Sequence, residues 1–197
     1  EIASFVSMAV IVPTLIGAAI AVQLCKKYDK FKIFYFSYMF ALILGIVRYI
    51  AGYENMMVYV ILNALGGFPL GIAAILQYQF TPDCYEYGQY KTGLKMRGVT
   101  FAAQTFFTKL NGAIATAASV FALTLIGFKE GEGVIQAAGF ADKLWTFSCL
   151  GSIIGGIGTL LILRLYKLND HDVQLMSKCN NGEITREEAE AQMINRY

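Results

Sequence analysis

Five runs of about 20 mostly apolar residues follow one another along this chain, and they constrain its fold more than any other feature. They cover roughly Ile2–Cys25, Ile33–Gly52, Met56–Phe80, Gly98–Phe128 and Phe140–Tyr166. A helix rises about 1.5 Å per residue, so each run can cross the roughly 30 Å hydrocarbon core of a bilayer. Helices in soluble cores, the alternative, seldom stay apolar on every face for so long. The sequence therefore predicts an all-α, multi-pass membrane protein with about five transmembrane helices.

Composition excludes several other classes of protein. Only 15% of the residues are charged, against roughly 25% in soluble domains, and the net charge of +2 gives no reason to expect nucleic acid as a partner. The four cysteines form no C-x-x-C pair, so we expect no metal or redox cofactor. The single histidine, His171, lies in polar sequence and is interpreted as a solvated surface residue, with a pH sensor or ligand as the alternative.

The basic residues predict how the spans are oriented. Nine of them follow the first, third and fifth spans, and three lie on the opposite side: Arg48, Lys129 and Lys143. By the positive-inside rule the larger group is cytoplasmic. The first span then begins outside the cell, the tail ends inside, and an odd number of spans is expected upstream in a longer chain. The predicted location is the cell (plasma) membrane.

The chain divides into a membrane part, residues 1–168, and a polar cytoplasmic tail, residues 169–197. Asn169 or Asp170 can cap a first short tail helix, and Thr185 and Glu188 have capping-box spacing for a second. Within the membrane part, Pro13 and Pro69 (in GGFPLG) are expected to interrupt or kink their helices. Gly151 and Gly155 form a G-x-x-x-G pattern that lets helices approach closely. These features fit plain packing or kinks that permit rocking.

Lys109 lies in the middle of the fourth span, where a charge is costly. A lysine at the bilayer centre costs roughly 2.5–3.5 kcal/mol on insertion scales. It is about 16 Å along the helix from Gly98, close to the midplane. No span contains an Asp or Glu away from its ends. A counter-charge is therefore expected from other helices, a ligand or water.

The fourth span is amphipathic within the membrane. On a helical wheel one face collects polar or small residues, flanked by Gln104 and Asn111: Thr105, Thr108, Lys109, Gly112 and Thr116. Such a face has to meet a bundle interior or a water-filled cavity. Either Lys109 only holds helices together through a carboxylate, or the face binds a polar solute such as a sugar, through its donors and acceptors. From the residues alone, the function is that of a polar-solute transporter or channel.

Charges gather in residues 82–98, PDCYEYGQYKTGLKMRG, which we expect to form a cytoplasmic loop after the third span. Opposite charges this close can pair with each other or across helices, and exposed pairs contribute only about 0–1 kcal/mol each. Such energies matter where inward and outward states differ by a few kcal/mol. The alternative is a solvated loop that only supports the topology.

This segment and the following span resemble the glycoside–pentoside–hexuronide:cation symporters, the melibiose-permease-like members of the major facilitator superfamily. The resemblance rests on Asp83-x-x-Glu86-Tyr87-Gly88-x-Tyr90-Lys91-Thr92-Gly93 with Lys95, and on Gln104-Thr105-x-x-x-Lys109. It covers about the whole chain, as helices 8–12 of a twelve-helix fold. Gln89 and Arg97 stand where the family usually has acids.

The resemblance implies secondary active transport of a glycoside, pentoside or hexuronide with Na⁺, H⁺ or Li⁺, by alternating access. It implies that Lys109, Thr105 and Gln104 line the substrate and cation cavity. It also implies a cytoplasmic gate: Asp83, Glu86, Tyr87, Gly88, Lys91 and Lys95. The cation-coordinating carboxylates lie in the amino-terminal half of such transporters, so the expected partners are that half, the lipid bilayer, the sugar and the coupling cation. No other cofactor is implied.

Two functional classes stand beside transport as alternatives. A membrane enzyme would need a nucleophile with a base, or a set of metal ligands, and the spans carry neither. The remaining alternative is a non-transporting membrane sensor or partner-binding module, in which the tail would be the functional part.

Overall fold

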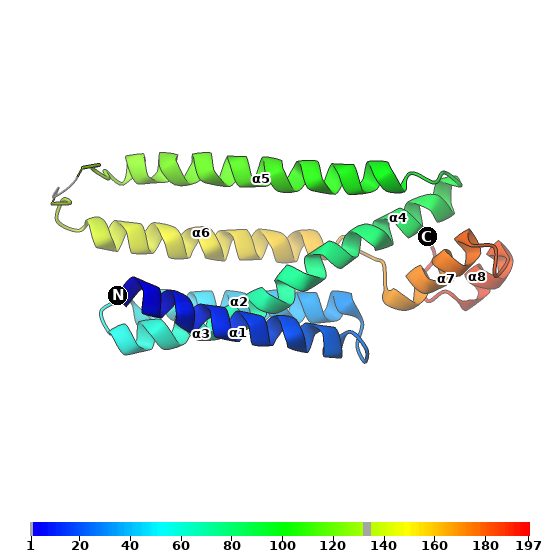
Figure 1. Ribbon diagram of the computed structural model, residues 1–197, viewed down its shortest axis with the longest axis horizontal. Coiled ribbons are helices and arrows are strands. Elements are labelled where there is room, and N and C mark those ends of the chain that lie inside the picture. The colour runs from blue at the N-terminus through cyan, green and yellow to red at the C-terminus, as the bar shows by residue number, and fades with distance from the viewer. Residues whose placement is uncertain (1, 132–134) are drawn as a thin grey trace.

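The computed structural model describes residues 2–131 and 135–197 as helices joined by short connections (Figure 1). The long helices are α1 (Ile2–Leu24), α2 (Lys30–Ala51), α3 (Met56–Leu76), α5 (Arg97–Leu125) and α6 (Phe140–Leu163). A 3₁₀ turn, η1 (Gln77–Gln79), joins α3 to α4 (Phe80–Thr92), and the tail forms α7 (Asp170–Asn180) and α8 (Arg186–Gln192). Five helices are long and apolar enough to cross a membrane.

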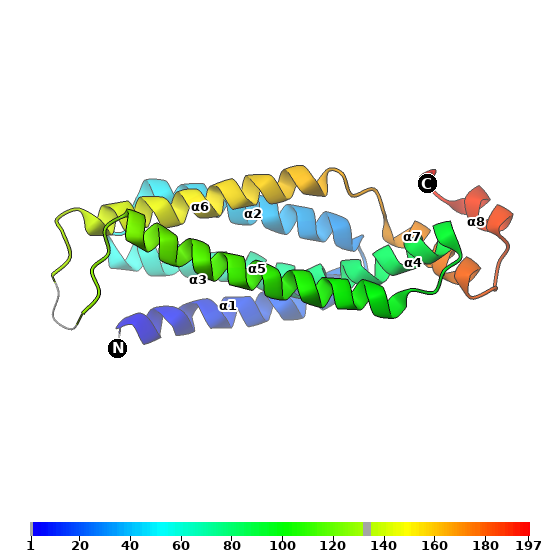
Figure 2. The same cartoon turned by 90° about the horizontal axis from the view of Figure 1, so that it is seen from above.

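The long helices run along one common axis, with their connections at two opposite ends. Seen from above, the amino terminus and the α5–α6 connection lie at one end, and α7, α8 and the carboxyl terminus lie at the other (Figure 2). The segments that carry most of the basic residues, between α1 and α2 and after α4, lie at the tail end (Figure 1). The fold thus separates the two groups of basic residues on which the predicted orientation depends.

The tightest helix contact is between α1 and α3, where glycines without side chains let the two backbones approach closely. A Cβ added to Gly17 would lie 2.1 Å from the Phe68 carbonyl oxygen, and one added to Gly71 would lie 1.9 Å from the Thr14 carbonyl oxygen. Both Pro13 and Pro69 lie inside continuous helices. The expected interruptions at the prolines are therefore wrong, and the GGFPLG segment instead brings two backbones together.

The predicted close contact at Gly151 and Gly155 is also absent from the described part of the chain. A Cβ on either residue would meet nothing within 4 Å, whereas one on the neighbouring Gly156 would lie 3.2 Å from Leu42 Cδ1. The α2–α6 contact therefore uses a different face of α6 from the one that the G-x-x-x-G spacing suggested.

A small core lies between α1, α2 and α3, near the tail end. Its buried members are Ala21, Ile33, Phe34, Ile72, Ala73 and Leu76. Phe80 packs edge-on against Phe34 (5.0 Å between ring centroids) and against Tyr166 (5.2 Å). Large apolar side chains are exposed along all five long helices. In a soluble protein so much exposed apolar surface would be unusual, whereas lipid covers it at no cost.

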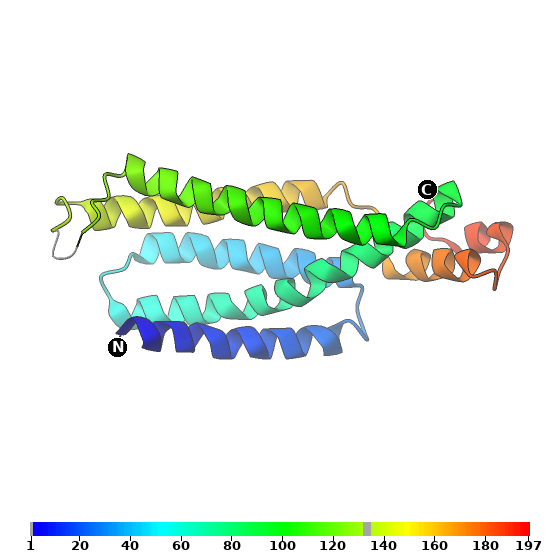
Figure 3. The same cartoon turned by 45° about the horizontal axis from the view of Figure 1, so that its top comes forward.

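The segment expected as a loop after the third span is mostly helical. The α-helix continues to Thr92, and Gly93 ends it in the left-handed conformation, with φ of 72° and its N–H donating to the Gln89 carbonyl. Glycine adopts this conformation without the strain that a Cβ would bring. Only residues 93–96 are loop, so α4 extends α3 as a helix on the tail side of the bundle (Figure 3).

Candidate functional site

The polar face of α5 is not covered by the other described helices. Apart from its contacts with α4, this helix packs only sparsely against the rest of the chain. Hydroxyls on the polar face donate to backbone carbonyls of the same helix, from Thr105 to Phe101 (3.0 Å) and from Thr108 to Gln104 (2.9 Å). Their oxygen lone pairs stay free to accept hydrogen bonds from a solute.

Lys109 is exposed on this face and forms no hydrogen bond or ion pair with any described residue. Within residues 2–131 and 135–197, then, nothing balances the ammonium group. The same face leaves Thr105 exposed. Both side chains are therefore accessible to groups outside the described helices.

An open pocket of about 520 Å³ lies between α5 and the α3–α4 junction. Gln104 belongs to its wall, together with Thr108 and Asn111, whereas Lys109 and Thr105 lie outside its lining. The structure thus brings one of the three predicted substrate residues to a pocket and leaves the other two on the open face of the same helix.

Sequence reasoning missed the opposite wall of this pocket. Gln77 and Tyr78 come from η1, and Phe80, Thr81 and Cys84 come from α4. The polar run Gln77–Gln79 near the end of the third predicted span was the available signal. There the chain forms a 3₁₀ turn, and Gln77 and Tyr78 of this turn line the pocket beside α5.

Asp83, one of the predicted gate residues, is the buried centre of an ionic cluster at the tail end. Asp83 is 4% exposed, and its carboxylate accepts a 2.6 Å hydrogen bond from Lys30 Nζ and another from the Tyr166 hydroxyl at 3.1 Å. Lys30 Nζ also lies 3.2 Å from Asp170 Oδ1. Burial and the neighbouring Asp83 carboxylate both raise the pKa of Tyr166, so its hydroxyl stays protonated and donates.

Asp29 and Asp170 exchange backbone hydrogen bonds at the starts of two helices. The Asp170 carboxylate accepts from the Lys30 N–H at 2.8 Å, and the Asp29 carboxylate accepts from the Asp170 N–H at 2.9 Å. Asp29 is also the N-cap of α2. Carboxylates at helix amino termini are favoured by the unpaired N–H groups and the helix dipole. This exchange joins the first tail helix to the start of a membrane helix.

Two further gate residues contact the tail rather than other charges of their own segment. Glu86 accepts from the Asn180 side-chain amide at 2.8 Å, and the rings of Tyr87 and Tyr197 meet edge-on at 5.8 Å. One turn later, Tyr90 donates to Glu190 at 3.0 Å. The tail therefore lies along α4 and covers its polar side.

The other three predicted gate residues form no ion pair or tail hydrogen bond among the described residues, although the charge of Lys91 acts on the nearby Glu190 carboxylate. Lys91 and Lys95 are exposed and form no ion pair there, and a Cβ on Gly88 would meet nothing within 4 Å. Lys30, which sequence reasoning used only to orient the spans, takes the cationic role beside Asp83. A partner 53 residues away in the chain leaves no local signal.

The tail forms the two short helices that were predicted. Asn169 caps α7, and the Thr185–Glu188 capping box is present in full. His171 is exposed, with its Nδ1 3.2 Å from Asp172 Oδ1. In residues 2–131 and 135–197, no group of three His, Cys, Asp or Glu side chains could hold a metal ion.

A bundle of long apolar helices, one of them with an uncovered polar face, indicates a multi-pass membrane protein. Residues 2–170 match the family described as MFS/sugar transport protein, and the chain belongs to this family of transporters. That places it among transporters and not among enzymes. No solved structure matches it.

Curated relatives are similar at low identity. A protein of Escherichia coli (strain K12) named as a sulfoquinovose importer is 25% identical over 185 residues, 90% of this chain and 38% of the relative. One named as a glycoside/cation symporter in the same organism is 21% identical, over 84% of this chain and 36% of the relative. One named as a 2,3-dihydroxypropane-1-sulfonate exporter in Salmonella typhimurium is 26% identical, over 57% of this chain and 24% of the relative. The chain spans little more than a third of the length of the first two.

Proposed function

We propose that this chain is the carboxy-terminal part of a secondary transporter that carries a sugar or glycoside across the plasma membrane together with Na⁺ or H⁺. It would supply five of twelve spans, and an amino-terminal half would supply the other wall of the cavity and most cation ligands. The family membership and the names of the symporters among the relatives support this assignment.

The observation that carries the proposal is the uncovered polar face of α5. Lys109 offers three N–H donors without a partner among the described residues, and the neighbouring hydroxyls keep free lone pairs. A charge near the membrane midplane is tolerated beside a hydrated cavity but not against acyl chains. In the proposal Lys109 donates to solute hydroxyls or to an acidic group, and Thr105 and Gln104 lie beside it.

Asp83, Glu86 and Tyr87 act in this proposal at the cytoplasmic end, where the tail and α4 close the pathway. Their contacts reach α2, the α6–α7 connection, α7 and the carboxyl terminus. A change in the direction of α4 would therefore either break these contacts or move their partners with it. In this proposal the remaining predicted gate residues contact the amino-terminal half of the transporter: Lys91, Lys95 and Gly88.

Uptake by the full-length protein tests the assignment. Lys109→Ala should lower accumulation of a transported sugar at least tenfold, because a charged hydrogen-bond donor contributes about 1.5–3 kcal/mol. Labelled glycosides, a hexuronide and sulfoquinovose form the panel, with and without Na⁺. Lys129→Ala, an exposed lysine outside the spans, is the matched control and should transport normally. Equal uptake by Lys109→Ala and the unmodified protein, at equal amounts in the membrane, would refute the role.

A further inference from the structure

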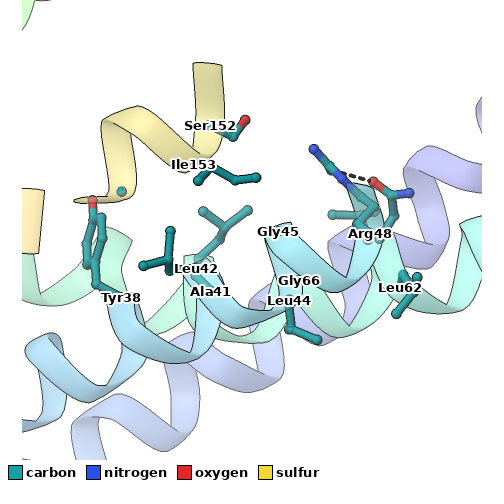
Figure 4. Close-up of a pocket in the computed structure, with 14 residues that line it drawn as sticks. Tyr38, Ala41, Leu42, Leu44, Gly45, Arg48, Leu62, Gly66, Ser152 and Ile153 are labelled. Atoms are coloured by element: carbon teal, nitrogen blue, oxygen red, sulfur yellow. Dashed lines mark hydrogen bonds between the residues drawn. The ribbon is translucent and has the colours of Figure 1, made fainter. Parts of the chain in front are cut away.

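A second pocket, of about 270 Å³, lies between α2, α3 and α6, away from the polar face of α5 (Figure 4). Its polar lining comes from Tyr38, Arg48, Asn63 and Ser152. The rest of its wall is apolar and includes Leu42, Leu44, Leu62, Leu70 and Ile153. None of these residues belongs to the pocket beside α5.

Arg48 lies in the last turn of α2, close enough to the helix end to reach water, yet its side chain turns into the bundle. Nη1 donates to Asn63 Oδ1 at 3.1 Å, and Nη2 makes a weak 3.9 Å contact with Cys149 Sγ. A guanidinium group carries five N–H donors. Nε is buried and has no hydrogen-bond partner in the described part of the chain.

Trp145 supplies a second unsatisfied donor next to this group. The Arg48 guanidinium lies 5.6 Å from the centre of the Trp145 ring, and the indole Nε1 is also buried without a partner. The rings of Tyr53 and Tyr59 pack beside the indole at 5.5 and 5.9 Å. Buried donors without acceptors are rare in folded proteins.

The positive charge of Arg48 is likewise uncompensated by the helices described. Among residues 2–131 and 135–197 no carboxylate forms an ion pair with it. The acid on the same turn as Trp145, Asp142, accepts a hydrogen bond from Tyr53 instead. A group that satisfied the site would therefore have to bring both negative charge and several acceptor oxygens.

We propose that Arg48 and Trp145 form a binding site for a tetrahedral oxyanion, a phosphate or a sulfonate. The apolar walls and the surrounding tryptophan and tyrosines, residues typical of membrane interfaces, favour the phosphate of an anionic phospholipid whose acyl chain enters the pocket. A guanidinium donates to such a group through two parallel N–H bonds. In the proposal the indole N–H of Trp145, which lies beside the guanidinium but outside the pocket lining, adds a third. The site is distinct from the proposed sugar pathway.

Native mass spectrometry of the purified full-length protein tests the site with phosphatidylglycerol as the probe. Dioleoylglycerol, which has the same acyl chains and no phosphate, is the reference lipid. Arg48→Gln should weaken phosphatidylglycerol binding at least tenfold and leave dioleoylglycerol binding unchanged. Trp145→Phe keeps the ring but removes the N–H, so it should weaken binding severalfold even if Arg48→Gln proves too unstable to purify.

Lys143→Gln is the matched control, because Lys143 is exposed at the same end of α6 and belongs to no pocket described here. Lys143→Gln should change the binding of phosphatidylglycerol less than twofold. Competition by methanesulfonate identifies a soluble oxyanion as the occupant, and its failure to compete identifies the lipid. If both substitutions leave the binding of phosphatidylglycerol and methanesulfonate unchanged, or if Lys143→Gln weakens it as much as Arg48→Gln, the site does not exist.

Discussion

A single carboxylate holds the last residues of the chain against the first tail helix. Asp172 is fully buried and accepts from the backbone N–H of Ile194 (2.8 Å) and of Asn195 (3.0 Å). The hydroxyl of Tyr197 and the side-chain amide of Asn169 donate to it as well. Burial alone would raise the pKa of Asp172, but these hydrogen bonds outweigh it and hold the pKa below its usual value.

Asp172→Asn should loosen this end of the tail, because an amide accepts through one oxygen only and brings a donor into a site full of donors. We expect the opening free energy of residues 193–197 to fall by about 1–3 kcal/mol. Hydrogen exchange of this segment in the full-length protein measures the effect. Glu187→Gln, at an exposed position in α8, should leave exchange unchanged, and equal protection in both variants would contradict the assignment.

The direction of the pKa shift also fixes the pH range of this contact. Because the folded-state pKa is lowered, the stabilisation by Asp172 is complete above its unfolded pKa near 3.8 and is lost as the pH falls through the folded value. In Asp172→Asn this part of the acid sensitivity should disappear.

At the scale of single helices, glycines at the α1–α3 contact make the sharpest prediction. Gly71→Ala would place a methyl group 1.9 Å from the Thr14 carbonyl oxygen, so the helices would have to separate. Overpacking of this kind costs about 1–3 kcal/mol or more. We expect a lower thermal midpoint for the full-length protein in detergent, read from its unfolding curve.

Gly66→Ala provides the comparison, because it lies in the same helix and its added Cβ would meet nothing within 4 Å. Alanine also has the higher helix propensity, by about 1 kcal/mol. Gly66→Ala should therefore match or exceed the unmodified midpoint. If the two variants melt together, α1 and α3 are not in the described contact.

The helices were predictable because hydropathy and length specify a membrane helix almost alone; the predicted start of α3 at Met56 and of α6 at Phe140 agree with the structure. The helical character of α4 was missed because hydropathy does not distinguish a polar helix from a loop. The G-x-x-x-G spacing also predicted the helix contact at the wrong glycines, Gly151 and Gly155. Spacing identifies a face of small residues, but only the fold determines which face a neighbouring helix covers.

The candidate site was predictable only in part for the same reason. Asp83 could be chosen from a motif in its own segment, whereas its partners Lys30 and Tyr166 come from distant helices. The pattern of polar residues on α5 was visible in sequence, but the wall that η1 adds opposite Gln104 depends on how α3 ends. Arg48 was interpreted only as a marker of orientation, because nothing nearby in the sequence indicates that its side chain turns inward.

At the scale of the whole molecule, the tail contacts both α2 and α4. The hydrogen bonds that Asp83 accepts from Lys30 and Tyr166 do not involve the tail and should survive its removal. Deleting residues 169–197 from the full-length protein should therefore leave at least half of the uptake rate, while hydrogen exchange in α4 rises about fivefold or more as its polar side is exposed. Cell-surface amount is the control. Loss of uptake at a normal surface amount would instead assign the tail an essential role, as in a sensor or partner-binding module.

The 3₁₀ turn at Gln77–Gln79 joins α3 to α4 and lies beside the pocket next to α5. A short 3₁₀ stretch inside a long helix often marks a hinge. Here Gln77 and Tyr78 border the pocket beside α5, and Asp83 follows just over one turn later. Bending at this turn would change the shape of the pocket and the position of the Asp83 carboxylate together, and would then link the occupancy of the pocket to the pairing of Asp83 with Lys30.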